Sequence, residues 1–257
     1  MIVRASVTAD MDDVAALVRA SFPDRLHPFM TYAQSGIATF LSAIAEQPLL
    51  FPGHRLLTCT DPAGIMAGFA EFRIDGETAL LSYICVTPAA RRTGAATRMI
   101  AHFLSQNPNL TRLDLDVFED NEPAVRFYEK MGFVSAARSL WLTRRLPVPA
   151  DGVAQAINPA GALAAFARYG FCEMPVQHNG CQHRLGRIGS RTLRCFAADD
   201  FDDEVLLAAV RHLLPDLDTA LLILPADHMR HGVGESINAS RRMSLELEER
   251  TWTGAAE

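Results

Sequence analysis

The chain of 257 residues has little cysteine and no long apolar run. Its five cysteines are too few and too scattered for a disulfide framework, so we expect reduced thiols. No apolar stretch approaches the roughly 18 residues that cross a bilayer, which argues against a membrane protein. The N-terminus lacks the charged start and apolar core of a signal peptide. We therefore expect a cytoplasmic protein with no membrane partner.

Lysine is also scarce, so nearly all positive charge is arginine. Lys130 is the only lysine, and the formal net charge is −6 at pH 7. Because a cationic surface is what attracts a phosphate backbone, this balance argues against a nucleic-acid partner. Hydrophobic residues make up 49% and charged residues 21%, which is typical of a soluble globular protein.

The first half of the chain carries an ordered series of helix and strand patterns, in which apolar residues recur at helical spacing or alternate. Hairpin turns are indicated at 61–64 and 75–77. This order predicts an α+β fold in which helices flank a mixed, mainly antiparallel sheet. The expected elements are a strand at 2–6, helices at 11–22 and 32–45, strands at 55–60, 65–74 and 78–86, a helix at 94–106, a strand at 112–118, a helix at 122–131 and a strand from 133.

Residues 144–151 are the best candidate for a linker, because two prolines there interrupt any regular element. We therefore expect one domain at residues 1–146 and a smaller α+β domain at residues 152–257. The second domain could also serve as a dimerisation unit, so a homodimer is one expected state.

The second half has weaker patterns. Residues 171–188 are interpreted as one hairpin that turns at Asn179-Gly180, the strongest short hairpin signal. This register places two histidines and two cysteines on one face, which are zinc ligand types. Their spacing fits no metal motif, and the same face looks like core, so we expect no metal. The four residues are Cys172, His178, Cys181 and His183. Further elements are expected at 191–197 (strand), 201–214 (helix), 219–225 and 242–248 (strands).

A short loop between Val86 and Gly94 joins a strand to a helix. Backbone N–H groups at a helix start have no internal partner and carry the positive end of the helix dipole, so they can bind a phosphate. Gly94 and the small Ala95 and Ala96 allow a ligand to approach the backbone. Arginine donors in the loop suit a pyrophosphate. Taken alone, the same pattern is also consistent with an ordinary turn.

A second stretch, residues 113–133, follows at the right distance to make the pair specific. Over about residues 1–146 the chain resembles the GNAT superfamily of acyl-CoA N-acetyltransferases. Its loop is similar to that family's Arg/Gln-x-x-Gly-x-Gly/Ala motif through Arg91, Gly94 and Ala96. The second stretch is similar to the family's strand–Asn–helix–Tyr–Gly–Phe pattern through Asn121, Ala124, Tyr128, Gly132 and Phe133.

The resemblance implies that acetyl-CoA binds as a cosubstrate between the strands that end at Val86 and Phe118. Pantetheine would follow the first of these strands, and the pyrophosphate would lie on the N–H groups of the loop and helix start. The residues it implies for acyl-CoA binding are Ile84, Cys85, Val86, Arg91, Arg92, Thr93, Gly94, Ala95, Ala96, Thr97, Asn121, Ala124, Phe127 and Tyr128.

The resemblance further implies direct transfer of an acetyl or short acyl group to a primary amine, with a small molecule as the expected acceptor. Tyr128 is the expected general acid that protonates the departing CoA sulfur, because phenol and thiol pKa values are close. Glu71 is the expected general base. Asp114, Asp116 and His27 are alternatives, and so is deprotonation of the amine in water. A catalytically silent module that binds acyl-CoA remains the rival hypothesis.

Residues 163–171 faintly echo residues 127–133, since both end a helical pattern on Gly-Phe. The second half is therefore interpreted as a degenerate, partial copy of the same fold. It contains no Arg-x-x-Gly-x-Ala loop ahead of a helix. We expect it to bind no acyl-CoA, and to shape the acceptor cleft or support the first half.

Overall fold

The computed structural model describes residues 1–149, 154–228 and 234–247. The first half of the chain forms strands and helices close to the expected ones. Its strands are β1 (Ile2–Ala5), β2 (His54–Thr60), β3 (Met66–Asp75), β4 (Thr78–Val86), β5 (Arg112–Phe118) and β6 (Val134–Arg145). Its α-helices are α1 (Met11–Ser21), α2 (Ile37–Glu46), α3 (Ala95–Gln106) and α4 (Glu122–Lys130).

The second half adds eight strands and three α-helices to the part of the chain that the structure describes. The strands are β7 (Ala154–Ala156), β8 (Phe171–Glu173), β9 (Val176–His178), β10 (Cys181–His183), β11 (Leu185–Ile188), β12 (Thr192–Cys195), β13 (Thr219–Pro225) and β14 (Glu235–Glu246). The helices are α5 (Pro159–Tyr169), α6 (Ala198–Asp202) and α7 (Glu204–Leu213). No helix in the described ranges is long and apolar enough to span a membrane.

One continuous sheet joins the two halves. Its strand order is β1-β2-β3-β4-β5-β14-β6-β13-β12-β11-β8, and β10-β9-β7 form a smaller sheet. Only β4–β5 and β12–β13 pair in parallel among these described strands. The predicted class, an α+β fold with a mainly antiparallel sheet flanked by helices, is confirmed.

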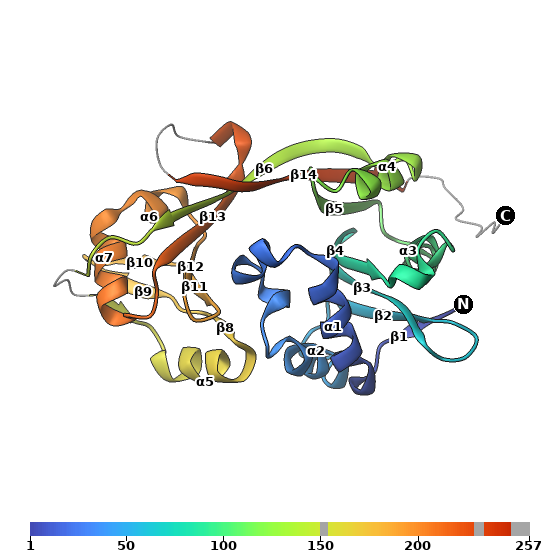
Figure 1. Ribbon diagram of the computed structural model, residues 1–257, viewed down its shortest axis with the longest axis horizontal. Helices are drawn as coiled ribbons and strands as arrows, with labels where there is room; N and C mark the ends of the chain where they lie inside the picture. Colours follow the sequence, from blue (N-terminus) through green and yellow to red (C-terminus); the bar gives the residue numbers. More distant parts are fainter. Residues whose placement is uncertain (150–153, 229–233, 248–257) are drawn as a thin grey trace.

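The two halves exchange their last strands. In each half a strand, a helix and a parallel strand follow one another, as β4–α3–β5 and as β12–α7–β13. The outgoing strand β6 then pairs with β13 of the second half, and β14 pairs with β5 of the first half. In Figure 1, β6 and β14 run side by side between the two halves.

The main sheet therefore contains strands from both sides of the expected linker. The division into residues 1–146 and 152–257 stays a prediction, but β14 extends the sheet of the first half with residues that come last in the described chain. Residues 150–153, where the expected linker ends, lie outside the described residues, and so does Glu248 of the expected final strand.

Three expectations about local structure were wrong. The helix expected from residue 32 begins only at Ile37, because a 3₁₀ turn and Gly36 precede it. The helix expected at 201–214 is interrupted at Asp203, whose carboxylate accepts from the N–H groups of Val205 and Leu206 and so starts α7 anew. The hairpin expected at 171–188 is confined to β9 and β10.

The third correction separates the residues of the considered zinc site. The predicted pairs His178–Cys181 and Val176–His183 are present in the smaller sheet. Cys172, however, lies on β8 and pairs with Arg187 of β11 in the main sheet. Among the described residues, no three potential ligands gather in the manner of a metal site.

Helices cover both faces of the first-half sheet. One core packs α3 and α4 against it, and includes Met243 and Leu245 of β14. A second core packs α1 and α2 on the opposite face. A separate core fills the second half beneath α7. The sheet therefore separates the two helix layers of the first half.

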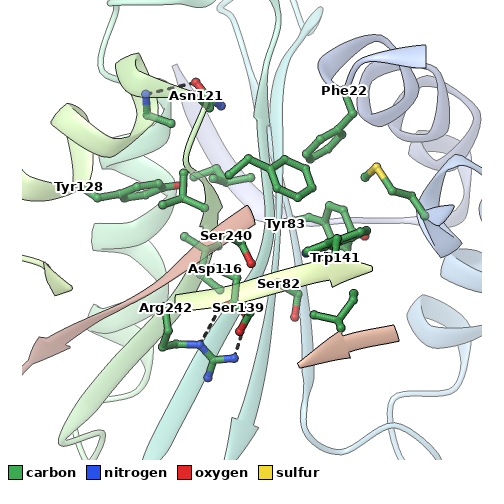
Figure 2. A pocket seen from close by; sticks show the side chains of 17 residues that line it. Phe22, Ser82, Tyr83, Asp116, Asn121, Tyr128, Ser139, Trp141, Ser240 and Arg242 are labelled. Atoms are coloured by element: carbon green, nitrogen blue, oxygen red, sulfur yellow. Dashed lines mark hydrogen bonds and ion pairs between the residues drawn. The ribbon is translucent and has the colours of Figure 1, made fainter. Parts of the chain in front are cut away.

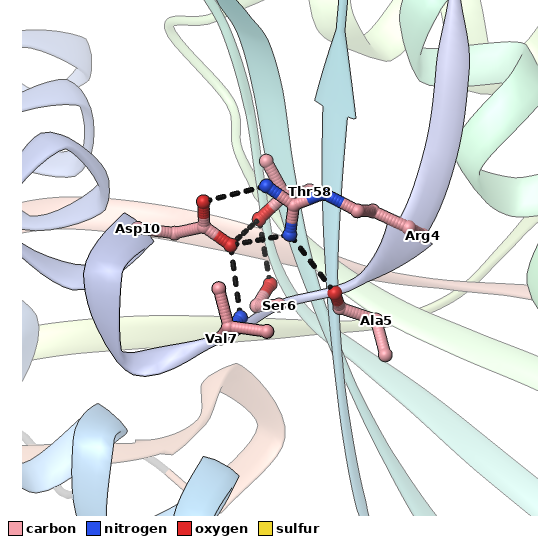
Figure 3. A network of polar contacts seen from close by, with 6 residues as sticks. All are labelled: Arg4, Ala5, Ser6, Val7, Asp10 and Thr58. Atoms are coloured by element: carbon pink, nitrogen blue, oxygen red, sulfur yellow. Dashed lines mark hydrogen bonds and ion pairs between the residues drawn. The ribbon is translucent and has the colours of Figure 1, made fainter. Parts of the chain in front are cut away.

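The start of the chain is fixed by a polar network between β1 and α1 (Figure 3). Arg4 donates to both carboxylate oxygens of Asp10, at 2.6 and 2.7 Å, and the Val7 N–H donates to the same carboxylate at 2.9 Å. The Arg4 guanidinium lowers the pKa of Asp10 despite partial burial. Asp10 also accepts from Thr58 of β2 at 3.2 Å, so the network sets the position of α1 against the sheet.

A substitution in β14 tests the strand exchange. Met243 is 1% exposed in the core beneath α3 and α4, so Met243→Ala should lower the free energy of unfolding by about 3 kcal/mol. The control Val134→Ala, at a side chain 70% exposed on β6, should change it by less than about 0.5 kcal/mol. Denaturant titration measures both values, and equal effects of the two substitutions would contradict the arrangement.

Candidate active site

A bulge in β4 opens the sheet of the first half. Leu81 pairs with Phe72 of β3 and Tyr83 pairs with Glu71, so Ser82 has no partner opposite it. A bulge bends its strand and ends regular pairing. The parallel pairing of β4 with β5 stops at the same point, with Leu81 opposite Leu115. Beyond it, the two strands separate and leave backbone groups of β4 without a β5 partner.

A cleft of about 340 Å³ occupies this gap. It extends from residues of α4 on one face of the sheet to Phe22 and Met30 beside α1 on the other. Figure 2 shows the labelled side chains converging from both sides. The lining residues are Phe22, Met30, Leu81, Ser82, Tyr83, Ile84, Asp116, Val117, Phe118, Asn121, Ala124, Tyr128, Ser139, Trp141, Ile223, Ser240 and Arg242.

The strand exchange supplies part of this lining. Ser240 and Arg242 come from β14, which lies beside β5, and Ile223 comes from β13. Trp141 lies on the segment of β6 that pairs with β13. The second half therefore contributes side chains to the lining of this cleft, and its expected role in shaping an acceptor site stays a prediction.

Asn121 and Tyr128 form the α4 side of the cleft. The Asn121 side chain accepts from the Ala124 N–H at 3.3 Å and caps the helix. The Tyr128 ring reaches from α4 into the cleft (Figure 2). Burial, with a smaller effect of Cys85, raises the pKa of Tyr128 well above its ordinary value, so its phenol keeps its proton.

The loop before α3 has the conformation of a backbone anion site. Arg92 and Gly94 adopt positive φ angles of 62° and 84°, which brings the chain sharply into the helix. The first-turn N–H groups of α3 have no intrahelical acceptors. Arg91 and Arg92 are exposed, and neither forms an ion pair with any described residue. The Thr93 hydroxyl is used within the loop, where it donates to the Ala90 carbonyl.

The structure brings only some of the expected acyl-CoA residues to the cleft. Ile84, Asn121, Ala124 and Tyr128 line it. Cys85 points to the core on the α1 face, where burial raises the pKa of its thiol to about 11. Val86 and Phe127 pack against the core on the α3–α4 face. The loop and helix-start residues from Arg91 to Thr97 do not line it; Arg91 to Gly94 are exposed, whereas Ala95 is buried.

Glu71 does not line the cleft. Its side chain is fully buried, and it accepts from the Tyr32 hydroxyl, from His54 Nδ1 at 2.9 Å and from Arg73 Nε at 3.2 Å. Burial opposes the charged carboxylate, but the His54 hydrogen bond and the Arg73 charge outweigh it, so the pKa of Glu71 lies below its ordinary value. Its role as general base stays a prediction.

The alternative bases also have partners. Asp116 lines the cleft but receives two hydrogen bonds from Arg242, at 2.8 and 2.7 Å. Asp114 accepts from the Ser244 hydroxyl at 2.7 Å. The His27 ring is buried, with Nε2 3.0 Å from the carbonyl oxygens of Arg19 and Phe22.

Several cleft residues were missed by the sequence analysis. Trp141 and Ser139 lie on β6, Ser240 and Arg242 on β14, and Phe22 at the end of α1. Trp141 sits in an alternating strand pattern and could have been flagged as a large half-buried aromatic. The β14 residues carried no signal, because nothing local indicates which strand β14 joins.

The corresponding point of the second half is unsuited to a phosphate. α6 and α7 follow β12 as α3 follows β4, but their start carries acidic side chains. The Asp203 carboxylate occupies the first N–H groups of α7 itself. Asp200 lies 2.7 Å from His183 Nδ1 and Glu204 pairs with Arg144. An anion would meet like charge there.

The family comparison concerns the first half of the chain. The family model for acetyltransferases of the GNAT family matches residues 15–133. Residues 15–133 form a GNAT domain. They include the bulged β4, the loop before α3, and α4 with Tyr128. No curated protein sequence matches the chain.

Solved structures share the fold of the whole chain. A tandem GNAT protein from the clavulanic acid biosynthesis pathway matches with a TM-score of 0.63 at 14% identity, covering 95% of this chain and 98% of the other. A GCN5-related N-acetyltransferase from Sphaerobacter thermophilus gives 0.61 at 13%, covering 95% of both chains. A putative acetyltransferase from Pyrococcus horikoshii gives 0.60 at 14%, covering 95% and 89%. The chain therefore has a tandem GNAT fold.

In that fold, residues 163–171 and residues 127–133, which share the Gly-Phe ending, take different places. α5 precedes β8, at the far edge of the sheet, whereas α4 leads from β5 to β6. The Gly-Phe sequences that end the two helices are therefore not equivalent positions. The repeat is carried by the order of elements around β4–β5 and β12–β13.

The buried Glu71 in the GNAT domain gives a pH prediction. Because its folded-state pKa lies below 4.5, its contribution to stability is complete above that pH and is lost as the pH falls through the lower folded value. Glu71→Gln should lower the free energy of unfolding by about 3 kcal/mol at neutral pH and flatten its decline below about pH 4.5. Denaturant titrations across this range measure both effects.

The control for this substitution is Glu77→Gln in the exposed β3–β4 turn, which should keep the profile of the unmodified protein. A Glu71→Gln protein of unchanged stability and unchanged acid sensitivity would show that the buried carboxylate is not a structural anion.

Proposed function

We propose that this protein transfers an acetyl or other short acyl group from CoA to the primary amine of a small molecule. The observation that carries the proposal is the cleft between β4 and β5, which reaches both faces of the sheet. Two ligands that enter from opposite faces can meet there without a covalent enzyme intermediate. Membership of residues 15–133 in the GNAT family supports transfer from CoA.

The donor would bind along the α3–α4 side. Backbone groups of β4 beyond Leu81 have no β5 partner and are free to hydrogen-bond the amides of pantetheine. The N–H groups from Arg92 to Ala96 suit the pyrophosphate, and Arg91 and Arg92 add charge without a competing carboxylate. The acidic start of α7 makes the second half an unsuitable place for the same group.

The transfer itself forms one bond and breaks one. The neutral amine nitrogen bonds to the thioester carbonyl carbon, the carbon–sulfur bond breaks, and the electron pair stays on sulfur. Tyr128 donates its phenolic proton to that sulfur, and water, which takes up the proton lost by the amine, returns a proton to the phenolate. The raised pKa of Tyr128 means that the phenol is protonated before the transfer, and it also makes the phenol a weaker acid than in water.

The amine would lose its proton to water. Asp116 is the only carboxylate in the lining formed by the described residues, and Arg242 already engages it. Glu71 is enclosed by its three donors. In this proposal Glu71 holds Tyr32, and through the Tyr32–Tyr83 stack at 3.9 Å it fixes one wall of the cleft.

Release of CoA thiol from acetyl-CoA, with pooled small amines as acceptors, tests the function. Tyr128→Phe should lower kcat by about a hundredfold, because it removes the proton that the leaving sulfur takes up. Acetyl-CoA affinity, measured by calorimetry, should change by less than about twofold, since the ring remains. The control Tyr169→Phe, on α5 and outside the cleft lining, should match the unmodified protein.

Unchanged kcat in Tyr128→Phe would contradict the general-acid assignment. A protein that binds acetyl-CoA but releases no thiol with any acceptor pool would instead be the silent acyl-CoA-binding module.

A further inference from the structure

The α1 side of the cleft is walled by aromatic rings. The Phe22 ring centre lies 5.9 Å from that of Tyr83 and 6.0 Å from that of Phe118. The Phe118 ring in turn lies 5.1 Å from Trp141. All four residues line the cleft, so their rings form one continuous apolar wall, and Met30 extends it. Such a wall suits a flat apolar ligand body, which gains from ring contacts as well as from burial.

No free charge accompanies this wall. Among the described lining residues, only Asp116 and Arg242 are charged, and each satisfies the other through two hydrogen bonds. A second ammonium group or a carboxylate on the ligand would therefore lose its water and meet no counter-ion. This argues against di- or polyamines and against zwitterionic amino acids.

Two polar atoms in the lining are left without partners. Ser82 Oγ, on the bulge of β4, and Trp141 Nε1, on β6, are buried and accept or donate no hydrogen bond within the described part of the chain. Buried polar groups are normally paired, so such atoms in a cleft point to a ligand group. An indole N–H can only donate, so the ligand needs an acceptor atom, and a hydroxyl can serve either way.

Building on the proposed function, we propose that the acceptor is a primary amine on a flat apolar body, with a single uncharged hydrogen-bond acceptor that Trp141 and Ser82 bind. The aromatic wall holds the body, and the indole N–H fixes its orientation. The amine then projects toward Tyr128 and the thioester. Trp141 is a positioning and specificity residue in this proposal, since it touches the part of the acceptor that does not react.

Calorimetry on the protein saturated with CoA tests the preference without turnover. 2-Phenylethylamine is compared with phenylalanine, which adds only a carboxylate, and with 1,5-diaminopentane, which replaces the ring with a second ammonium group. We expect 2-phenylethylamine to bind about tenfold more tightly than either. Equal or tighter binding of phenylalanine or of the diamine overturns the proposal, and so does a failure of all three to bind.

A second comparison tests the hydrogen bond. Trp141→Phe keeps a ring and removes the N–H. Tyramine and its meta-hydroxyl isomer are both measured, and the substitution should lower the affinity for the tighter-binding of the two about fivefold. It should change 2-phenylethylamine, which has no ring hydroxyl, by less than about twofold. Ser82→Ala is measured in the same way. Equal losses for ligands with and without the hydroxyl would show that Trp141 contributes shape alone, and would overturn the anchoring role.

Controls keep this test separate from folding and from catalysis. Tyr169→Phe and Ser105→Ala remove comparable groups outside the cleft and should leave every amine affinity unchanged. CoA affinity, measured in each variant, reports an intact fold. Tight binding of 2-phenylethylamine without thiol release would refute the acyl transfer and leave this inference standing. Acetylation of 1,5-diaminopentane in preference to 2-phenylethylamine would support the acyl transfer and refute this inference.

Discussion

Hydrogen bonding between β14 and β5 is the interaction on which the rest of this structure depends. From Ser240–Phe118 to Glu246–Arg112, it covers the free edge of β5 with a strand from the other end of the described chain. Met243 and Leu245 thereby enter the core beneath α3 and α4. Because β14 takes this place, β6 can continue outward and pair with β13. The two halves are thus parts of one sheet.

The cleft follows from this arrangement. The bulge at Ser82 separates β4 from β5, but on its own it would leave an open notch in the sheet. β14, β6 and β13 close that notch with Ser240, Trp141 and Ile223. The match to the GNAT family therefore covers the part of the chain that contains β4, the loop before α3 and α4, whereas strands of both halves line the cleft.

The starts of α3 and α7, which hold equivalent places in the two halves, differ in charge. The start of α3 offers unpaired backbone N–H groups and two arginines without ion pairs in the described structure. The start of α7 fills the same topological place with carboxylates, one of which caps the helix. In the proposed function the first half holds the phosphates of CoA, and the second half contributes side chains to the cleft lining.

Much of the first half could be predicted from sequence because its signals are local. Periodicity placed α1, α3, α4 and β2 to β5 within a few residues, and the loop at Arg91–Ala96 with the Asn121–Tyr128 stretch indicated the family. Strand partners are set by contacts far apart in sequence, so the place of β14 could not be predicted. The burial of Glu71 depends on His54 and Tyr32, which no pattern links to it. The break at Asp203 was missed because a cap residue and a helix residue look alike within an acidic run.

Amide hydrogen exchange of the whole chain, with and without acetyl-CoA, tests the central claim most directly. The claim is that a cleft built by both halves binds acyl-CoA only through the first. Acetyl-CoA should slow exchange at residues 92–97 and at residues 82–86 of β4, and leave residues 203–206 at the start of α7 unchanged. Protection at 203–206, or none at 92–97, would contradict this account.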